Sequence, residues 1–270
     1  MKPIRINDLH EAVSVIEQYK KRSTESNCFL MPDDLRCLVD ERRLLVHLEG
    51  PNAFLLEDKG NCLRVHYMMN NPESGFSCMT DKPLMLELPF RGSDGEPTSM
   101  VSYWEHKGFR RNLVRSNLSA KVSDIELYDY SDPDLVISIA STDEETDFAR
   151  KLFNSSFDPY SGDYLTPDNA KEIVANGKML LAYDSGQPAG ALNFYQVGKC
   201  TWLGHVAVLP SYRGRGVGIA LVSEYIRKNN IDDKSRYALW VQEQNVAAIK
   251  LYNRLGFKYA GKSSLSMIKE

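Results

Sequence analysis

The sequence predicts an α/β (α+β) protein in which helices flank a central sheet. Strand-like and helix-like stretches alternate along all 270 residues, twice in a similar order. A glycine-rich turn at 213–218 joins a β-branched run to an amphipathic segment, as in strand–turn–helix units. Hydrophobic residues make up 43% of the chain and charged residues 26%, so we expect a packed globular protein long enough for two domains.

The first half begins with apolar residues at helical spacing between Asp8 and Arg22. Shorter helices are expected at 33–40 and 100–106. Extended segments are expected, in order, at 44–48, 53–56, 63–69, 84–88 and 109–119.

The second half follows a similar order, beginning with a strand at 135–140 and an acidic amphipathic helix at 143–155. Thr166 is a suitable N-cap for a helix to about residue 175, with proline at its first position. The remaining elements are expected as strands at 179–183, 189–195 and 202–209, a helix at 219–228, a strand at 237–241, a helix after Asn245, and a strand at 257–268.

The turn reads Arg213-Gly214-Arg215-Gly216-Val217-Gly218. The first N–H groups of a helix lack internal partners and the helix dipole favours an anion there, so the turn is a candidate phosphate site. It is not the nucleotide-triphosphatase loop, because no Lys-Ser or Lys-Thr follows the glycines. The dinucleotide fingerprint fits weakly, because Ile219 stands at its third glycine position. The pattern [QR]-x-x-G-x-[GA] fits fully, and in it the turn resembles the GNAT superfamily of N-acetyltransferases.

A second stretch strengthens this resemblance. It begins at Asn245, a good N-cap, has Tyr252 seven residues later, and ends with Gly256 and Phe257. The second motif of the same family is similar: an Asn at the helix start, a Tyr seven residues on, then Gly-Phe. The two motifs cover roughly residues 200–257, and the resemblance implies the GNAT fold, with a mixed, mostly antiparallel sheet.

The resemblance also implies roles for the residues of both motifs. The protein would transfer an acetyl group from acetyl-CoA directly to a primary amine, with Tyr252 protonating the leaving thiolate. Asn245 would contact the pantetheine arm, and Arg213 and Arg215 could meet cofactor phosphates. The expected cofactor-binding residues are Val206 and Val208 through their backbone, Arg213, Gly214, Arg215, Gly216, Val217, Gly218 and Asn245. The general base stays open between His205, Asp163, Glu243 and a water-mediated route.

The two halves of the sequence can be aligned. Residues 103–110 match 251–258, with a Gly-Phe pair in each, but the first half has no R-x-x-G-x-G. We therefore expect a degenerate GNAT-like domain at 1–128 without the cofactor loop and a catalytic domain at 129–270. The alternative is an unrelated α+β domain that happens to carry Gly-Phe. If the repeat is real, Trp104 stands where Tyr252 stands in the second copy, and Trp cannot act as an acid.

The charge and composition of the chain argue against nucleic acid and membranes as partners. A net charge of −3 gives no basic footprint for nucleic acid, and no apolar run approaches the length of a membrane span. The N-terminus lacks the apolar core of a secretory signal, and the five cysteines form no C-x-x-C pair, so we expect no metal site and a cytoplasmic location.

The acceptor is expected to be a small-molecule or peptide amine, and the protein a monomer or homodimer. The segment 153–168 occupies the place where the family shapes its acceptor pocket, and Asp158, Asp163, Tyr160 or Tyr164 could receive a cationic amine. Two other functions stay open: a non-catalytic CoA-binding sensor or interaction module, and an acyltransferase with a different acyl donor.

Overall fold

The computed structural model describes residues 2–270 except 73–74, 130–131, 162–163 and 230–235. The chain divides into two compact units. Unit 1 comprises Met1–Val114 together with Ser263–Glu270, and unit 2 comprises Arg115–Lys262.

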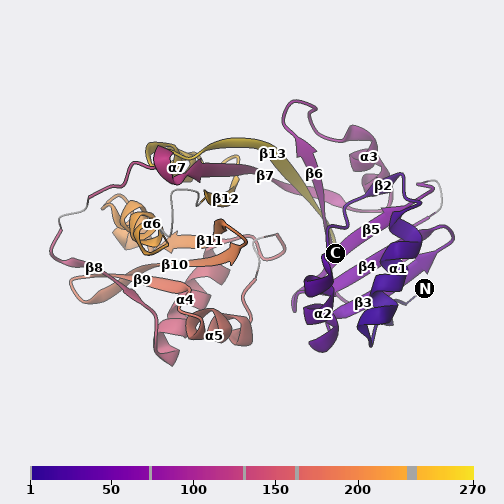
Figure 1. Ribbon diagram of the computed structural model, residues 1–270, viewed down its shortest axis with the longest axis horizontal. Helices are drawn as coiled ribbons and strands as arrows, with labels where there is room; N and C mark the ends of the chain where they lie inside the picture. Colours follow the sequence, from indigo (N-terminus) through magenta and orange to yellow (C-terminus); the bar gives the residue numbers. More distant parts are fainter. Residues whose placement is uncertain (1, 73–74, 130–131, 162–163, 230–235) are drawn as a thin grey trace. The chain divides into compact units, whose positions relative to one another are not determined.

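Unit 1 is an α/β unit whose strands lie in the order β1-β3-β4-β5-β6-β13-β7, with β2 added to β5 (Figure 1). Its first helix begins after Asp8, whose carboxylate accepts the Glu11 N–H at 2.8 Å. Its elements are β1 (Ile4–Arg5), α1 (Leu9–Lys20), β2 (Glu25–Ser26), α2 (Pro32–Asp40), β3 (Leu44–Glu49), β4 (Asn52–Asp58), β5 (Leu63–Met69), β6 (Leu84–Arg91), α3 (Thr98–His106), the first part of β7 (Arg110–Lys121) and the end of β13 (Lys258–Lys269).

Unit 2 has the strand order β7-β12-β11-β10-β9-β8. All of these pairs are antiparallel except β11 with β12. Its elements are the end of β7, η1 (Val122–Asp124), β8 (Leu135–Ile139), α4 (Asp143–Ser156), α5 (Pro167–Ala175), β9 (Met179–Asp184), β10 (Gln187–Val197), β11 (Cys200–Val208), η2 (Pro210–Tyr212), α6 (Val217–Lys228), β12 (Arg236–Gln242), α7 (Val246–Arg254) and the first part of β13.

Helices cover both faces of the unit 2 sheet, because apolar side chains of its strands point to both faces. Side chains of successive strand residues point to opposite faces. Leu180 and Ala182 of β9 accordingly belong to the same apolar cluster as α6, whereas Met179 and Leu181 belong to the cluster that contains residues of α4. This two-sided burial fixes the register of the strands that carry the candidate site.

The two units repeat one order of elements, as the alignment of the two halves of the sequence predicts. In each unit three antiparallel pairings are followed by one parallel pairing, β5 with β6 and β11 with β12. Helices α3 and α7 both end before a glycine with positive φ, Gly108 at 84° and Gly256 at 94°, and a phenylalanine follows each. Between β5 and β6 the described residues contain no helix, so the counterpart of α6 is missing from the first copy.

The last strand of each repeat ends in the other unit. Strand β7 follows α3 of unit 1, yet from Arg115 onward it belongs to unit 2, where it pairs with β12. Strand β13 belongs to unit 1 from Ser263 onward. The domains expected at 1–128 and 129–270 stay a prediction about the sequence repeats, because the compact units divide within these two strands.

Candidate functional site

The candidate site of unit 2 lies where β11 and β12 stop pairing. Their parallel register runs from Cys200–Arg236 to Leu203–Leu239, and β11 then continues to Val208 beside β10 alone. Gly204 is the extra residue of a bulge at this point, since Leu203 pairs with Phe194 and His205 pairs with Asn193. The edge of β11 that faces away from β10 is therefore open after the bulge.

Two backbone N–H groups point toward this open edge. The Leu209 N–H donates to Ala189 O of the β10 side at 2.9 Å. Because N–H directions alternate along a strand, those of Val206 and Val208 point away from β10. The Val208 carbonyl lies on the same side and accepts from Arg213 Nε at 3.2 Å. The edge thus offers donors to an extended ligand arm, as a strand would use them.

The glycine turn ends at the N-terminus of α6 with its backbone exposed. Gly214 and Gly216 have φ angles of 79° and 84°, a region that favours glycine, and a Cβ on either would meet no atom within 4 Å. Open space beside unpaired helix N–H groups suits an anionic ligand. Gly218 has a different role, because a Cβ there would lie 3.3 Å from Leu251 Cδ1 of α7. It lets α6 and α7 pack closely.

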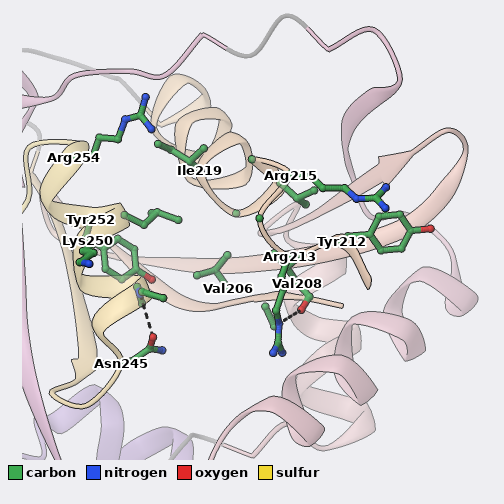
Figure 2. Close-up of a pocket in the computed structure, with 18 of the residues that line it drawn as sticks. Val206, Val208, Tyr212, Arg213, Arg215, Ile219, Asn245, Lys250, Tyr252 and Arg254 are labelled. Atoms are coloured by element: carbon green, nitrogen blue, oxygen red, sulfur yellow. Dashed lines mark hydrogen bonds between the residues drawn. The ribbon is translucent and has the colours of Figure 1, made fainter. Parts of the chain in front are cut away.

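One cavity of about 960 Å³ brings these features together. Figure 2 shows Val206 and Val208 from β11, Arg213 and Arg215 from the turn, and Tyr252 from α7 around it. Every residue that the sequence assigned to catalysis or cofactor binding lines this cavity: Val206, Val208, Arg213, Gly214, Arg215, Gly216, Val217, Gly218, Asn245 and Tyr252. Three further lining residues were not predicted from the sequence: Tyr128, Lys250 and Arg254.

The cavity is strongly positive. Its lining contains Arg213, Arg215, Lys250 and Arg254 but no Asp or Glu. Arg215 reaches Asp184, a residue outside the lining, at 3.3 Å. A ligand in this cavity meets four cations and the N-terminus of α6, so the cavity favours a polyanion.

Tyr252 and Asn245 are held at opposite ends of α7. Tyr252 is 4% exposed, and burial raises the pKa of its phenol well above the ordinary value, so the hydroxyl keeps its proton at neutral pH. Asn245 caps the helix, its Oδ1 accepting the Ala248 N–H at 3.1 Å, and its Nδ2 is the donor that remains for a ligand.

The residues considered for the general base have different surroundings. His205 is buried, stacks on Phe153 at 5.1 Å and has Nδ1 3.1 Å from Asn193 Oδ1, and it does not line the cavity. Glu243 accepts a hydrogen bond from Ser116 Oγ at 2.9 Å. Asp163 lies outside the described residues.

The acceptor segment is organised by Asp158. Its Oδ1 accepts hydrogen bonds from the Tyr160 N–H at 3.1 Å and from the Ser161 N–H and Oγ at 2.8 and 2.7 Å. These bonds stabilise the loop after α4, so this oxygen is already used before any amine arrives. Nothing in the contacts of Tyr160 or Tyr164 assigns either to an acceptor.

The matching edge in unit 1 is closed by β2, which pairs with the end of β5, and by the side chain that follows β2. Asn27, just after β2, donates from Nδ2 to Val65 O at 3.1 Å and to Glu87 O at 2.9 Å, and its Oδ1 accepts the Tyr67 N–H at 2.6 Å. The amide thus bridges β5 and β6 where the second copy has its open edge. Trp104, at the position that aligns with Tyr252, is fully buried among aromatic rings.

Comparisons with known proteins identify the domain. Residues 143–257 match the acetyltransferase (GNAT) family. An uncharacterized N-acetyltransferase from Methanocaldococcus jannaschii is 32% identical over 98 residues, which cover 32% of this chain and 42% of that protein. This chain therefore spans less than half the length of that relative. The match to the acetyltransferase (GNAT) family thus covers residues 143–257, somewhat less than half of this chain.

Solved structures share the fold of the whole chain. A GCN5-related N-acetyltransferase from Sphaerobacter thermophilus is similar with a TM-score of 0.61 and 14% identity over 99% of this chain and 95% of its own. A tandem GNAT protein from the clavulanic acid biosynthesis pathway has a TM-score of 0.61 and 13% identity over 99% and 97% of the two chains. At these identities the likeness concerns the fold, and it agrees with the repeat seen in the two units.

The described residues contain neither a membrane-spanning helix nor a metal-binding cluster. Among them, no helix combines the length and the apolar character needed to cross a membrane. The same residues contain no group of three or more His, Cys, Asp or Glu side chains arranged to hold a metal ion.

Proposed function

We infer that this chain transfers an acetyl group from acetyl-CoA to a primary amine of a small molecule or peptide. The observation that carries this proposal is the cavity of unit 2. It joins an open strand edge, a glycine turn at a helix N-terminus and four cations, without a carboxylate in its lining. The GNAT domain that contains it supports acyl transfer as the reaction class.

The residues present fit acetyl-CoA. The open backbone at Gly214 and Gly216 suits the pyrophosphate, and the two outward N–H groups of β11 suit the amides of a pantetheine arm. A volume of about 960 Å³ is at the upper end of the range for small-molecule sites, as a long nucleotide requires. NAD fits less well, because its fingerprint requires a glycine where this chain has Ile219.

The chain's own groups supply positioning and a proton. When bound, acetyl-CoA would supply an activated acyl carbon: the new carbon–nitrogen bond would replace the carbon–sulfur bond, the proton lost by the amine would pass to water, and CoA would leave as the thiolate. The backbone N–H groups of Val206 and Val208 donate to carbonyl oxygens of a ligand bound along the strand edge. One such oxygen is that of the thioester, on which negative charge develops during the reaction. The Tyr252 phenol, protonated at neutral pH, donates toward the sulfur that leaves. Its raised pKa favours a strong hydrogen bond to the thiolate ahead of complete proton transfer.

Calorimetric titration with acetyl-CoA tests the cofactor assignment. We expect one site per chain, no heat with NAD, and loss of binding in Gly216→Asp, because a carboxylate would face the phosphates from a backbone position with φ of 84°. Gly198→Asp is the matched control, since Gly198 also has positive φ and open space but does not line the cavity. Unchanged affinity in Gly216→Asp would show that the turn is not the phosphate site.

A further inference from the structure

The cavity of unit 2 carries its positive charge on two elements. Arg213 and Arg215 stand in the turn before α6, whereas Lys250 and Arg254 lie four residues apart on α7. Residues at this spacing share one face of a helix, and both side chains line the cavity (Figure 2). A bound polyanion therefore meets cations at two places, and the glycine turn accounts for only one of them.

The two groups differ in the contacts they already make. Arg213 is hydrogen-bonded to the Val208 carbonyl at 3.2 Å, and Arg215 is paired with Asp184 at 3.3 Å. Within the described parts of the chain, no carboxylate lies at ion-pair distance from Lys250 or Arg254. The positive charge of Lys250 and Arg254 is therefore not neutralised by a carboxylate and is available to a further anionic group of the ligand, beyond the group that the turn binds.

Arg254 is held in place by an aromatic ring. The Cζ atom of its guanidinium lies over the ring of Tyr128, 4.8 Å from the ring centroid, a cation–π contact. Tyr128 is itself hydrogen-bonded to two residues of α6. Its backbone N–H donates to Ser223 Oγ at 3.3 Å, and its carbonyl accepts a hydrogen bond from Arg227 at 3.1 Å. A cation–π contact uses no N–H donor of the guanidinium in a hydrogen bond, so these donors can bind a phosphate.

The α7 pair is also close to the turn. Leu251, the residue after Lys250, packs against the first turn of α6, since a Cβ on Gly218 would lie 3.3 Å from its Cδ1. In coenzyme A a single ribose joins the pyrophosphate to the 3′-phosphate. A 3′-phosphate must therefore lie within one sugar of the turn, and α7 is the helix that packs beside the turn and places two cations in the same cavity.

We propose that Lys250 and Arg254 bind the 3′-phosphate of acetyl-CoA and make this protein selective for CoA over 3′-dephospho-CoA. The inference rests on the proposed function, because it needs CoA in this cavity. It assigns the pyrophosphate to the turn and the 3′-phosphate to α7. Tyr128 is a positioning residue that orients the guanidinium of Arg254.

The test compares CoA with 3′-dephospho-CoA, which differs only in the phosphate at issue, by calorimetry at fixed ionic strength. Because hydrogen bonds to charged groups are strong, we expect wild type to prefer CoA by about ten- to hundredfold. Lys250→Gln combined with Arg254→Gln should lower CoA affinity to that of dephospho-CoA and leave dephospho-CoA affinity unchanged. Lys228→Gln, on α6 outside the cavity lining, is the control and should keep the preference.

The position of Arg254 is tested separately. Tyr128→Phe keeps the ring and should keep the preference, whereas Tyr128→Ala should reduce it. Equal binding of the two nucleotides by wild type would overturn this inference and leave the proposed function standing. A preference that survives in the double variant would also overturn it. Binding of neither nucleotide would refute the proposed function itself.

Discussion

Asn27, together with β2, closes the strand edge of unit 1 that corresponds to the open edge of β11 in unit 2, and loss of its side chain should destabilise unit 1. Its side-chain amide makes three hydrogen bonds, to Val65 O, Glu87 O and the Tyr67 N–H, and the residue is 7% exposed. These bonds take the place of strand pairing between β5 and β6. We therefore expect Asn27→Ala to destabilise unit 1 and to open this edge without creating a cofactor site.

The magnitude follows from the three bonds. A buried donor or acceptor that loses its partner costs about 1–3 kcal/mol, and entering water recovers part of this cost. Three such groups, with partial recovery, give a loss of about 3–4 kcal/mol in the free energy of unfolding. Asn27→Asp should be similarly harmful, because a carboxylate would place lone pairs against two carbonyl oxygens.

Urea denaturation combined with hydrogen exchange is the assay. The midpoint should fall in Asn27→Ala, and the backbone amide of Tyr67 should exchange faster. Asn70→Ala is the matched control. Asn70 is an exposed asparagine directly after β5, the strand of Tyr67, and its hydrogen bond to Asn52 is made by its backbone N–H, which the substitution keeps. A change below about 1 kcal/mol, or an unprotected Tyr67 amide in wild type, would refute the reasoning, since either means that the amide does not satisfy this edge.

Two further predictions concern catalysis and acid stability. Tyr252→Phe should lower kcat about a hundredfold or more in an acetyl-transfer assay, while acetyl-CoA affinity stays within about twofold. The control is Tyr259→Phe, which should change neither quantity, because Tyr259 is an exposed residue of β13. Unaltered turnover would remove Tyr252 from the acid role, and the absence of turnover with any amine would favour a CoA-binding module. Glu57 is the second case: burial raises its pKa, but the hydrogen bond from His66 and neighbouring cations lower it more, to well below the usual range. Its contribution to stability is therefore complete above the unfolded carboxyl pKa and lost as the pH falls toward the folded pKa. Glu57→Gln should be less stable than wild type at pH 7, with the gap closing on acidification in urea melts; a gap independent of pH would contradict this.

Local pattern predicted most of the elements. The run 63–69 and the helix after Thr166 follow from residue periodicity and capping, which act between neighbours in the chain. The pairing of β7 with β12 could not be predicted this way, because periodicity assigns a strand to a face and says nothing of its partner. The exchange of the last strands is accordingly visible only in the tertiary structure.

The candidate site divides in a similar manner. Gly214 and Gly216 were predictable from the sequence. Their positive φ angles favour glycine, and both stand within the glycine-rich motif at 213–218. Lys250 and Arg254 carried one signal, their spacing of four residues on a helix, but such pairs are common on solvent-exposed faces. Asn27 carried none, because its partners lie about forty and sixty residues away.

The sequence by itself determined the class of fold, the repeat and the position of a glycine turn at the start of a helix. These depend on interactions within a few residues, and spacing along the chain records them directly. The tertiary structure alone decided that Asn27 fills the edge of the first copy, that Asn193 satisfies the bulge beside His205, and that α7 adds cations to the cavity. Those outcomes depend on which distant strands and helices meet, and burial and hydrogen bonding settle that only when the whole chain has folded.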